Sequence, residues 1–302
     1  MAVVDDVNGA QLSAQEKRGH QMLIFRRIIA YVVLILVCVL ALFPFVTLLV
    51  NLTKDHATLT STFNLIPGSN FLSNMSRVLT HNADGTRPVF HAMLNSFIVA
   101  AVSCLLSVYV AALTAYGLYA YEFRLKKAAF IFIMVILMVP TQVSALGYVD
   151  MVKNVMGLYN SYIPLIFPMI AAPGVFFFIK QYMESSLPME IVEAGRIDGG
   201  HEFYIFNFVV MPILKPAMAV QLIFQFVASW NSYFLPQLLM DTNSENATLP
   251  LIIAGLQAEA NGNFNLGEVY MVLGIAIIPL IIVYLCLSKF IIRGIALGSV
   301  KG

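Results

Sequence analysis

Polar residues able to do chemistry gather in one stretch of the chain, between two long apolar segments. The stretch runs from residue 184 to residue 202 and contains one arginine, Arg196, and no lysine. Its carboxylates are Glu184, Glu190, Glu193, Asp198 and Glu202. Such an acidic surface has the wrong sign for an anionic bilayer, which attracts lysine and arginine. The residues alone leave two interpretations open, a docking element for a soluble protein or a solvated loop with incidental acids.

This stretch has the signals of two short helices joined by a tight turn. Pro188 suits the first turn of a helix, where its missing N–H costs nothing. Gly199 and Gly200 are expected to end that helix, because glycine readily takes the left-handed cap conformation. A second helix is predicted from His201 to Met211, ahead of Pro212. On the first helix, the apolar residues Ile191, Ala194, Gly195 and Ile197 can pack on one face, while Glu190 and Glu193 project elsewhere.

The rest of the chain has the composition of a membrane protein. Of its 302 residues, 60% are hydrophobic and 11% are charged, and the mean hydropathy is +0.84. Soluble domains average roughly 45–50% apolar and about 25% charged residues, so lipid must be the solvent for much of this chain. Long apolar runs without alternation predict an all-α membrane protein. Six transmembrane helices are expected, at 28–52, 90–121, 128–146, 163–182, 213–238 and 269–289.

Basic residues set the expected orientation of these spans. With the N-terminus inside, 13 of the 17 lysines and arginines fall in inner segments and 4 in outer segments. This bias follows the positive-inside rule and predicts that both termini are cytoplasmic. Residues 1–27 are then a cytoplasmic N-terminal tail, and residues 28–302 are the transmembrane domain. The acidic loop, at about 183–212, is a helix-turn-helix on the cytoplasmic side.

Several kinds of chemistry are excluded by what the chain contains. Its net charge of +1 is too small for a strong electrostatic reader of nucleic acid, so no nucleic-acid partner is expected. The three cysteines are scattered in apolar runs without metal-ligand spacing, and we expect no metal site. The chain has neither a glycine-rich phosphate-binding loop nor a His-Glu-x-x-His pair, so we expect no enzyme activity of its own.

The acidic loop also resembles a known motif. Glu193-Ala194-Gly195 is followed by Asp198-Gly199-Gly200 and later by Met211-Pro212. This series resembles the EAA motif of the membrane subunits of binding-protein-dependent ABC importers, in which alanines usually stand at the positions of Gly195 and Gly200. Segments at 115–117, 138–142, 157–162, 176–182 and 230–233, and the tail at 293–302, resemble the maltose-permease-like carbohydrate subgroup.

The resemblance implies the permease subunit of an ATP-driven importer in a bacterial or archaeal cytoplasmic membrane. The implied partners are two ABC ATPase subunits, a second homologous permease, an extracytoplasmic solute-binding protein and a carbohydrate, most simply an oligosaccharide. ATP and Mg would be bound by the ATPase, and no cofactor by this chain. The resemblance assigns ATPase coupling to Glu190, Glu193, Ala194, Gly195, Arg196, Asp198, Gly199 and Gly200.

The predicted spans also indicate the kind of solute. Their interiors contain no Asp, Glu or Arg, which argues against a proton-coupled carrier and favours a neutral solute. The polar and aromatic side chains available to a pathway are Asn95, Gln142, Gln221, Gln225, Trp230, Asn231, Ser232 and Tyr233. Taken singly, an Asn or Gln in a span is more often a helix–helix contact than a ligand, and Trp230 can be an interfacial aromatic residue. A self-sufficient secondary carrier or a channel for a neutral solute is the alternative function.

Overall fold

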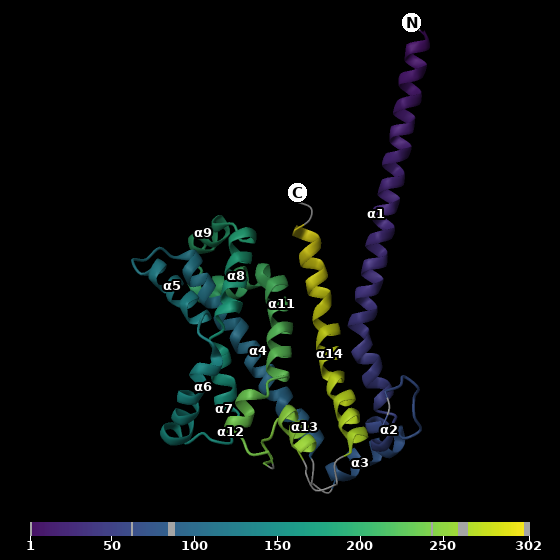
Figure 1. The fold of residues 1–302 in the computed structure, drawn as a ribbon. Coiled ribbons are helices and arrows are strands. Elements are labelled where there is room, and N and C mark those ends of the chain that lie inside the picture. Colours follow the sequence, from purple (N-terminus) through teal and green to yellow (C-terminus); the bar gives the residue numbers. More distant parts are fainter. Residues whose placement is uncertain (1, 62, 84–87, 243, 259–264, 299–302) are drawn as a thin grey trace.

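The protein is a bundle of long helices whose two termini lie at the same end (Figure 1). The structure, a computed structural model, describes residues 2–61, 63–83, 88–242, 244–258 and 265–298. Its elements are α1 (Ala2–Asn51), α2 (His56–Ser61), α3 (Phe71–Ala83), α4 (Val89–Ala120), α5 (Lys126–Leu137), α6 (Thr141–Asp150), η1 (Met151–Met156), α7 (Ile163–Ile170), α8 (Pro173–Ser186), α9 (Met189–Ile197), α10 (Glu202–Tyr204), η2 (Ile205–Val210), α11 (Met211–Trp230), α12 (Phe234–Leu239), α13 (Leu249–Ala258) and α14 (Leu266–Gly298). Across these described ranges there is no β-strand, which confirms the predicted all-α class.

In the described part of the chain, 5 helical segments are long and apolar enough to cross a membrane. They are Met22–Asn51, Val89–Ala120, Ile163–Ser186, Glu202–Trp230 and Leu266–Ser288. A sixth span is obtained when α5 and the helical segment made by α6 and η1 count as one. Each of the six predicted spans therefore has a counterpart in the structure.

The third span, predicted at residues 128–146, is broken near Pro140 into two helical segments. α5 ends at Leu137, and the next helical segment meets it at an angle of 91°. Pro140 is the N-cap of α6. It cannot continue α5, because proline lacks the backbone N–H that a longer α5 would need there. α5 has 12 residues. At about 1.5 Å per residue it is therefore too short to cross a hydrocarbon core of about 30 Å alone.

The fifth span begins earlier and ends earlier than predicted. The separate helix predicted from His201 to Met211 is wrong, because α10, η2 and α11 form one continuous helical run. Pro212 lies in the first turn of α11, where its missing N–H is tolerated, directly after the π-helical turn η2. The chain leaves the helix at Asn231, so the predicted end at residue 238 falls in the separate helix α12.

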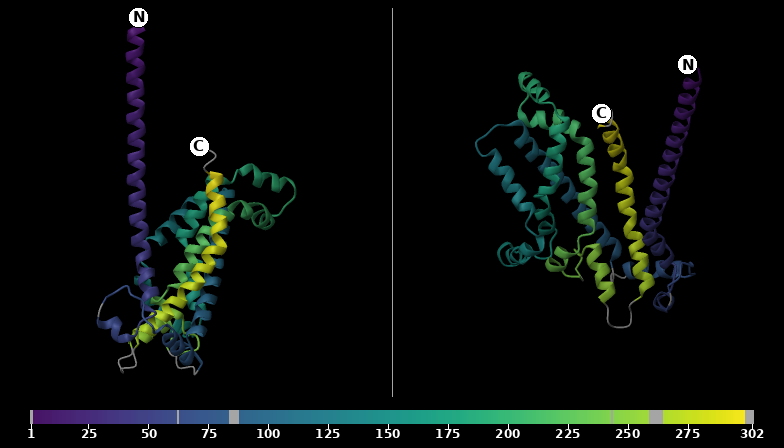
Figure 2. Two further views of the ribbon diagram at one scale, coloured as in Figure 1. Left: turned by 90° about the vertical axis from the view of Figure 1, so that its right-hand side faces the viewer. Right: turned by 45° about the horizontal axis from the view of Figure 1, so that its top comes forward.

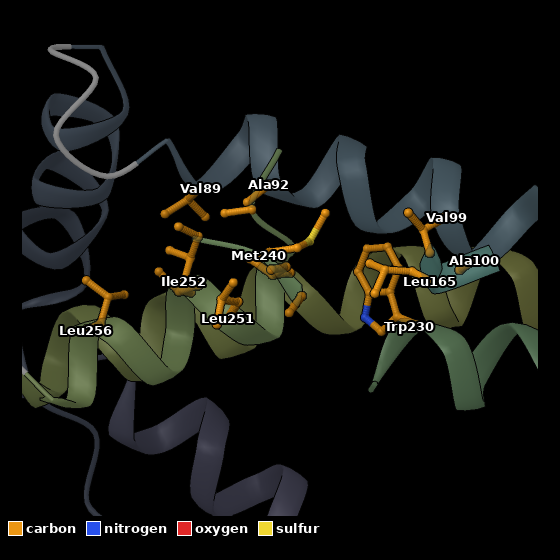
Figure 3. Close-up of a cluster of buried hydrophobic side chains, with 14 of the residues drawn as sticks. Val89, Ala92, Val99, Ala100, Leu165, Trp230, Met240, Leu251, Ile252 and Leu256 are labelled. Carbon is orange, nitrogen blue, oxygen red and sulfur yellow. The ribbon is translucent and has the colours of Figure 1, made fainter. Parts of the chain in front are cut away.

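α4 is the central helix of the bundle and packs against α11, α8 and α7. It runs for 32 residues without an internal proline, whereas α1, α7, α11 and α14 each contain one. One hydrophobic core follows the first half of α4 and includes Val89, Val99 and Trp230 (Figure 3). A second core surrounds the other end of α4 and includes Tyr116 and Phe206. The same helix thus belongs to both cores.

α1 and α9 stand away from the centre of the bundle (Figures 1 and 2). The most apolar part of Met22–Asn51 has no buried residue, and α1 contacts α14. α9 lies at the end where both termini lie, as expected if all three are on one side of the membrane. That this side is cytoplasmic, and that residues 1–27 are a separate tail, stay predictions. Residues 299–302, the end of the tail that resembles the carbohydrate subgroup, lie outside the described residues.

Candidate functional site: coupling loop and polar cavity

The coupling loop contains one short helix, α9, whose two ends are fixed by proline and glycine. Pro188 is the N-cap, with extended backbone at φ −63° and ψ 134°. At the other end Gly199 has φ +81°, in the left-handed region that favours glycine. Its N–H donates to the carbonyl of Arg196, and the N–H of Gly200 donates to that of Gly195, both at 3.0 Å. These two bonds form a Schellman motif, so the predicted glycine stop is confirmed.

Two glycines of this loop face the side chain of Ile205, which is only 1% exposed. A Cβ atom added at Gly195 would lie 3.2 Å from Cγ1 of Ile205. One added at Gly200 would lie 2.9 Å from the carbonyl oxygen of Gly195 and 3.2 Å from the same Cγ1. Carbon atoms in van der Waals contact prefer about 3.5–4.0 Å. At these two positions the EAA motif usually has alanine. Here glycine leaves the space that the side chain of Ile205 occupies.

α9 packs on the rest of the chain through Val192 and leaves most of its other apolar residues exposed. Val192 is completely buried, whereas Ile191 is 37% exposed and Ile197 is 86% exposed. Ala194 is exposed as well, so of these four apolar residues only Gly195 packs closely on this chain, against Ile205. Exposed carboxylates border them at Glu190, Glu193 and Asp198. We call this apolar and acidic surface, formed by Glu190, Ile191, Glu193, Ala194, Ile197 and Asp198, the α9 surface.

Arg196, a predicted coupling residue, points away from the α9 surface and binds two other parts of the chain. Its Nε donates to Oε1 of Glu202 at 2.6 Å, and its guanidinium also donates to the carbonyl of Ala120 at 3.2 Å. The hydroxyl of Tyr116 donates to Oε2 of Glu202 at 2.6 Å. The hydrogen bond to Glu202 raises the pKa of Arg196. Sequence reasoning missed this arrangement, because Tyr116 and Glu202 are 86 positions apart and no local pattern links them.

A cavity of about 730 Å³ lies among α4, α6, α7, α8, α11 and α12. Four predicted pathway residues line it, namely Gln142, Gln221, Gln225 and Ser232. Gln221 and Gln225 are joined there by Ser229, which the prediction missed. Their spacing of four residues places all three on one face of α11, as a polar stripe about 12 Å long at 1.5 Å per residue. That spacing is the signal by which Ser229 could have been found.

The wall of this cavity is neutral. No charged side chain occurs among the described residues that line it. Two lining residues, Ser229 and Thr248, have buried hydroxyl groups without a hydrogen-bond partner. Amides and hydroxyls of this kind can bind the hydroxyl groups of an uncharged solute. Over the described residues, no three His, Cys, Asp or Glu side chains gather as metal ligands.

Three other predicted pathway residues lie apart from this cavity. Trp230, Asn231 and Tyr233 line a second cavity of about 670 Å³, together with residues of α1, α13 and α14. The ring of Trp230 is 3% exposed and stacks on Phe226, with 5.9 Å between ring centroids. The structure therefore gives Trp230 a packing role in the core of Figure 3.

Asn95 lines neither cavity and is 2% exposed. Its amide nitrogen donates to the carbonyls of Glu245 and Ala247, at 2.7 Å and 3.0 Å. The neighbouring Ser96 accepts a hydrogen bond from the N–H of Leu249 at 2.8 Å. Asn95 thus fixes the segment before α13 to α4, which is a structural role rather than a place on the wall of either cavity.

A multispanning helical bundle that encloses a neutral polar cavity has the architecture of a membrane transport protein. The chain belongs to the family of the binding-protein-dependent transport system inner membrane component, whose model matches residues 107–297. It is 32% identical over 218 residues to the arabinooligosaccharides transport system permease protein AraQ of Bacillus subtilis (strain 168), covering 70% of this chain and 74% of that protein. It is 30% identical over 271 residues to the sn-glycerol-3-phosphate transport system permease protein UgpE of Escherichia coli (strain K12), covering 89% and 95%.

Solved structures share the fold. One of them is a bacterial ABC transporter involved in the import of the acidic polysaccharide alginate, with a TM-score of 0.72 over 87% of this chain and 95% of that chain, at 22% identity. Family and relatives confirm that this chain is a permease component of the inner membrane. They favour that class over a self-sufficient carrier or channel, and the relatives are transport proteins rather than enzymes.

Proposed function

We propose that this chain is the membrane subunit of an ATP-driven importer of a neutral carbohydrate, and that the α9 surface docks on a separate ATPase. The complete importer contains two ATPase subunits, a second homologous permease and an extracytoplasmic binding protein. ATP and Mg are held by the ATPase subunits. α9 and both termini face the cytoplasm. A family in which transport depends on a binding protein supports this composition.

The exposure of Ile197 is the observation that carries the docking proposal. This side chain is 86% exposed, yet α9 is not part of any candidate membrane span in the described chain. Hydrocarbon therefore does not cover it, and the neighbouring carboxylates of Glu190 and Glu193 do not suit an anionic lipid surface. A groove on a protein can cover the isoleucine and pair the carboxylates, as helix-in-groove complexes do.

Replacing Ile197 with aspartate tests the dock. Burial of an isoleucine contributes about 1.5–3 kcal/mol, so Ile197→Asp should weaken the ATPase complex about tenfold or more. Ile66→Asp is the matched control, because Ile66 is 74% exposed and belongs to the segment between α2 and α3, two helices that lie at the other end of the molecule from α9 (Figure 1). The measurement is the amount of ATPase that co-purifies with the tagged chain from solubilised membranes. Equal recovery with both variants would show that α9 is not the dock.

The neutral cavity supports an uncharged cargo. The relatives are named for arabinooligosaccharides, for glycerol-3-phosphate and for alginate, so the family carries both neutral and anionic solutes. An anion inside a protein needs charged or numerous hydrogen-bond partners, because burial of an unpaired charge is costly. The described wall of the cavity offers amides and hydroxyls but no arginine, lysine or histidine. An oligosaccharide of neutral sugars fits this wall better than the two anions do.

Uptake by the purified importer distinguishes these cargoes. Proteoliposomes with the binding protein outside and ATP inside are supplied with radiolabelled arabinotriose, glycerol-3-phosphate or an alginate trisaccharide. We expect ATP-dependent uptake of arabinotriose and background uptake of the two anions. Uptake of an anion in preference to arabinotriose would refute the neutral cargo. Uptake without ATP, by this chain alone, would establish the carrier instead.

A further inference from the structure

We propose that Tyr116 and Glu202 form the joint through which movement of α9 reaches α4, and that both are positioning residues for coupling. The inference rests on the proposed function, because it requires an ATPase docked on the α9 surface. It goes further by naming the contacts within this chain that carry the movement from the dock to the cavity wall.

The last turns of α4 hold α9 at both of its ends. At the C-terminal end, Arg196 binds Glu202, whose other carboxylate oxygen accepts the hydrogen bond of Tyr116. At the N-terminal end, the hydroxyl of Tyr119 donates to the carbonyl of Leu187 at 2.5 Å, directly before the N-cap of α9. Tyr116 and Tyr119 are three residues apart and so are neighbours on the surface of α4. α9 cannot shift relative to α4 without breaking at least one of these contacts.

The Tyr116–Glu202 bond is the protected part of this joint. The Arg196–Glu202 pair is partly open to solvent, with side-chain exposures of 33% and 37%, so water and salt weaken it. The Tyr116 residue is only 3% exposed, and its ring packs on Phe206 with 5.4 Å between centroids. A hydrogen bond to a carboxylate is stronger than one between neutral groups. Loss of the single hydroxyl of Tyr116 should therefore loosen the joint while the buried ring stays in place.

α4, with 32 residues, is longer than α8 and α11, the long helices that precede and follow α9 in the chain. It is an unbroken helix without an internal proline, and it reaches from Tyr116 to Val99 and Ser96 in the cavity wall. Both chain connections of α9 contain an interruption of the regular α-helix. On one side the chain passes through the π-helical turn η2, and on the other α8 is separated from α7 at Ala171 and Ala172. Through these polar contacts a push on α9 reaches α4, and along its unbroken helix the cavity wall at Val99 and Ser96.

The test measures how ATP changes access to the cavity wall in the complete importer. Val99→Cys supplies a thiol on α4 that lines the cavity, after Cys38, Cys104 and Cys286 are replaced by alanine. The rate of labelling with N-ethylmaleimide is compared in nanodiscs with and without ATP plus vanadate. Tyr116→Phe is the test variant. Tyr159→Phe is the matched control, since Tyr159 also donates to a carboxylate, Asp241 at 2.8 Å, in an outer loop away from α9.

We expect trapping with ATP and vanadate to change the labelling rate about tenfold in the parent and in Tyr159→Phe. Loss of one hydrogen bond to a charged group, worth roughly a decade in an equilibrium constant, is enough to remove a change of that size. In Tyr116→Phe the change should shrink to within about twofold, with as much ATPase bound as in the parent. Glu202→Gln keeps an oxygen acceptor for Tyr116 and should restore part of the response that Glu202→Ala loses. A merely structural defect would lower the bound ATPase as well.

The remaining outcomes separate the two proposals. If the labelling response of Tyr116→Phe equals that of the control, the joint is wrong and the docked importer stands. If ATPase binds but the parent shows no response to ATP and vanadate, α4 does not carry the movement, and the joint is again wrong. If no ATPase is recovered with any variant, the proposed function is wrong. The joint is then wrong as well, because it requires a docked ATPase.

Discussion

Replacing Gly195 with alanine tests how tightly the coupling loop is packed. The added methyl group would lie 3.2 Å, 3.4 Å and 3.6 Å from Cγ1, Cδ1 and Cγ2 of Ile205. Overpacking of a close-packed site costs about 1–3 kcal/mol, whereas alanine in place of glycine within a helix contributes about 0.5–1 kcal/mol of stability. The net effect expected for Gly195→Ala is a loss of about 1 kcal/mol in the local stability of α9.

The same substitution should have the opposite effect when Ile205 is truncated. Ile205→Ala removes all three atoms that the new methyl group would meet, so Gly195→Ala should then stabilise α9 by about 0.5–1 kcal/mol. The coupling between the two sites is about 2 kcal/mol. Gly199→Ala is the matched control, because its Cβ would meet no atom within 4 Å while its φ of +81° strains any other residue. It should cost about 1 kcal/mol in both backgrounds.

Hydrogen exchange of peptides that cover α9 reports this local stability in the full chain. Because 1.4 kcal/mol corresponds to a factor of ten, Gly195→Ala should speed exchange about fivefold alone. In the Ile205→Ala background it should slow exchange about two- to fivefold. A measured coupling below about 0.5 kcal/mol, the usual limit for independent sites, would refute the close packing of these glycines on Ile205.

Three further substitutions examine the other parts of the site. Asn95→Leu leaves the carbonyls of Glu245 and Ala247 without their donor, and a buried unsatisfied group costs about 1–3 kcal/mol. Limited proteolysis should then cut the segment at 240–248 at least about fivefold faster than in the parent. Gln225→Leu removes an amide from the polar stripe, so the KM for arabinotriose uptake should rise about tenfold with unchanged recovery of ATPase. Glu193→Lys reverses a charge on the α9 surface and should lower the recovered ATPase about tenfold, while hydrogen exchange of α9 stays as in the parent.

Features that depend on a few neighbouring residues could be predicted from the sequence. The bounds of α9 follow from Pro188 and from the left-handed glycine at 199, whose effects act within one turn of helix. The membrane spans follow from the length of apolar runs, because the thickness of the bilayer fixes that length. The position of the break could be predicted from Pro140. Its angle of 91° could not, because the angle depends on how the two halves of the span pack.

The orientation of α9 could not be predicted, because hydrophobicity does not say which protein covers a side chain. Val192 and Ile197 are both apolar, yet the first is buried by this chain and the second is exposed. Asn95 and Gln221 are both polar residues in spans, yet one holds a loop and the other lines the cavity. The helix that continues through Pro212 depends on a π-helical turn that no residue type announces.

α4 connects the coupling loop with the polar cavity, because hydrogen bonds hold it at both of its ends. At one end Tyr116 and Tyr119 hold the coupling loop, and at the other Asn95 and Ser96 hold the segment that leads into α13. The two attachment points are 20 residues apart, which at about 1.5 Å per residue is about 30 Å, the thickness of the hydrocarbon core. That outer segment contains Thr248, which lines the cavity. A displacement of α4 at the inner end must therefore move part of the cavity wall at the outer end, unless the polar contacts of Asn95 and Ser96 break first.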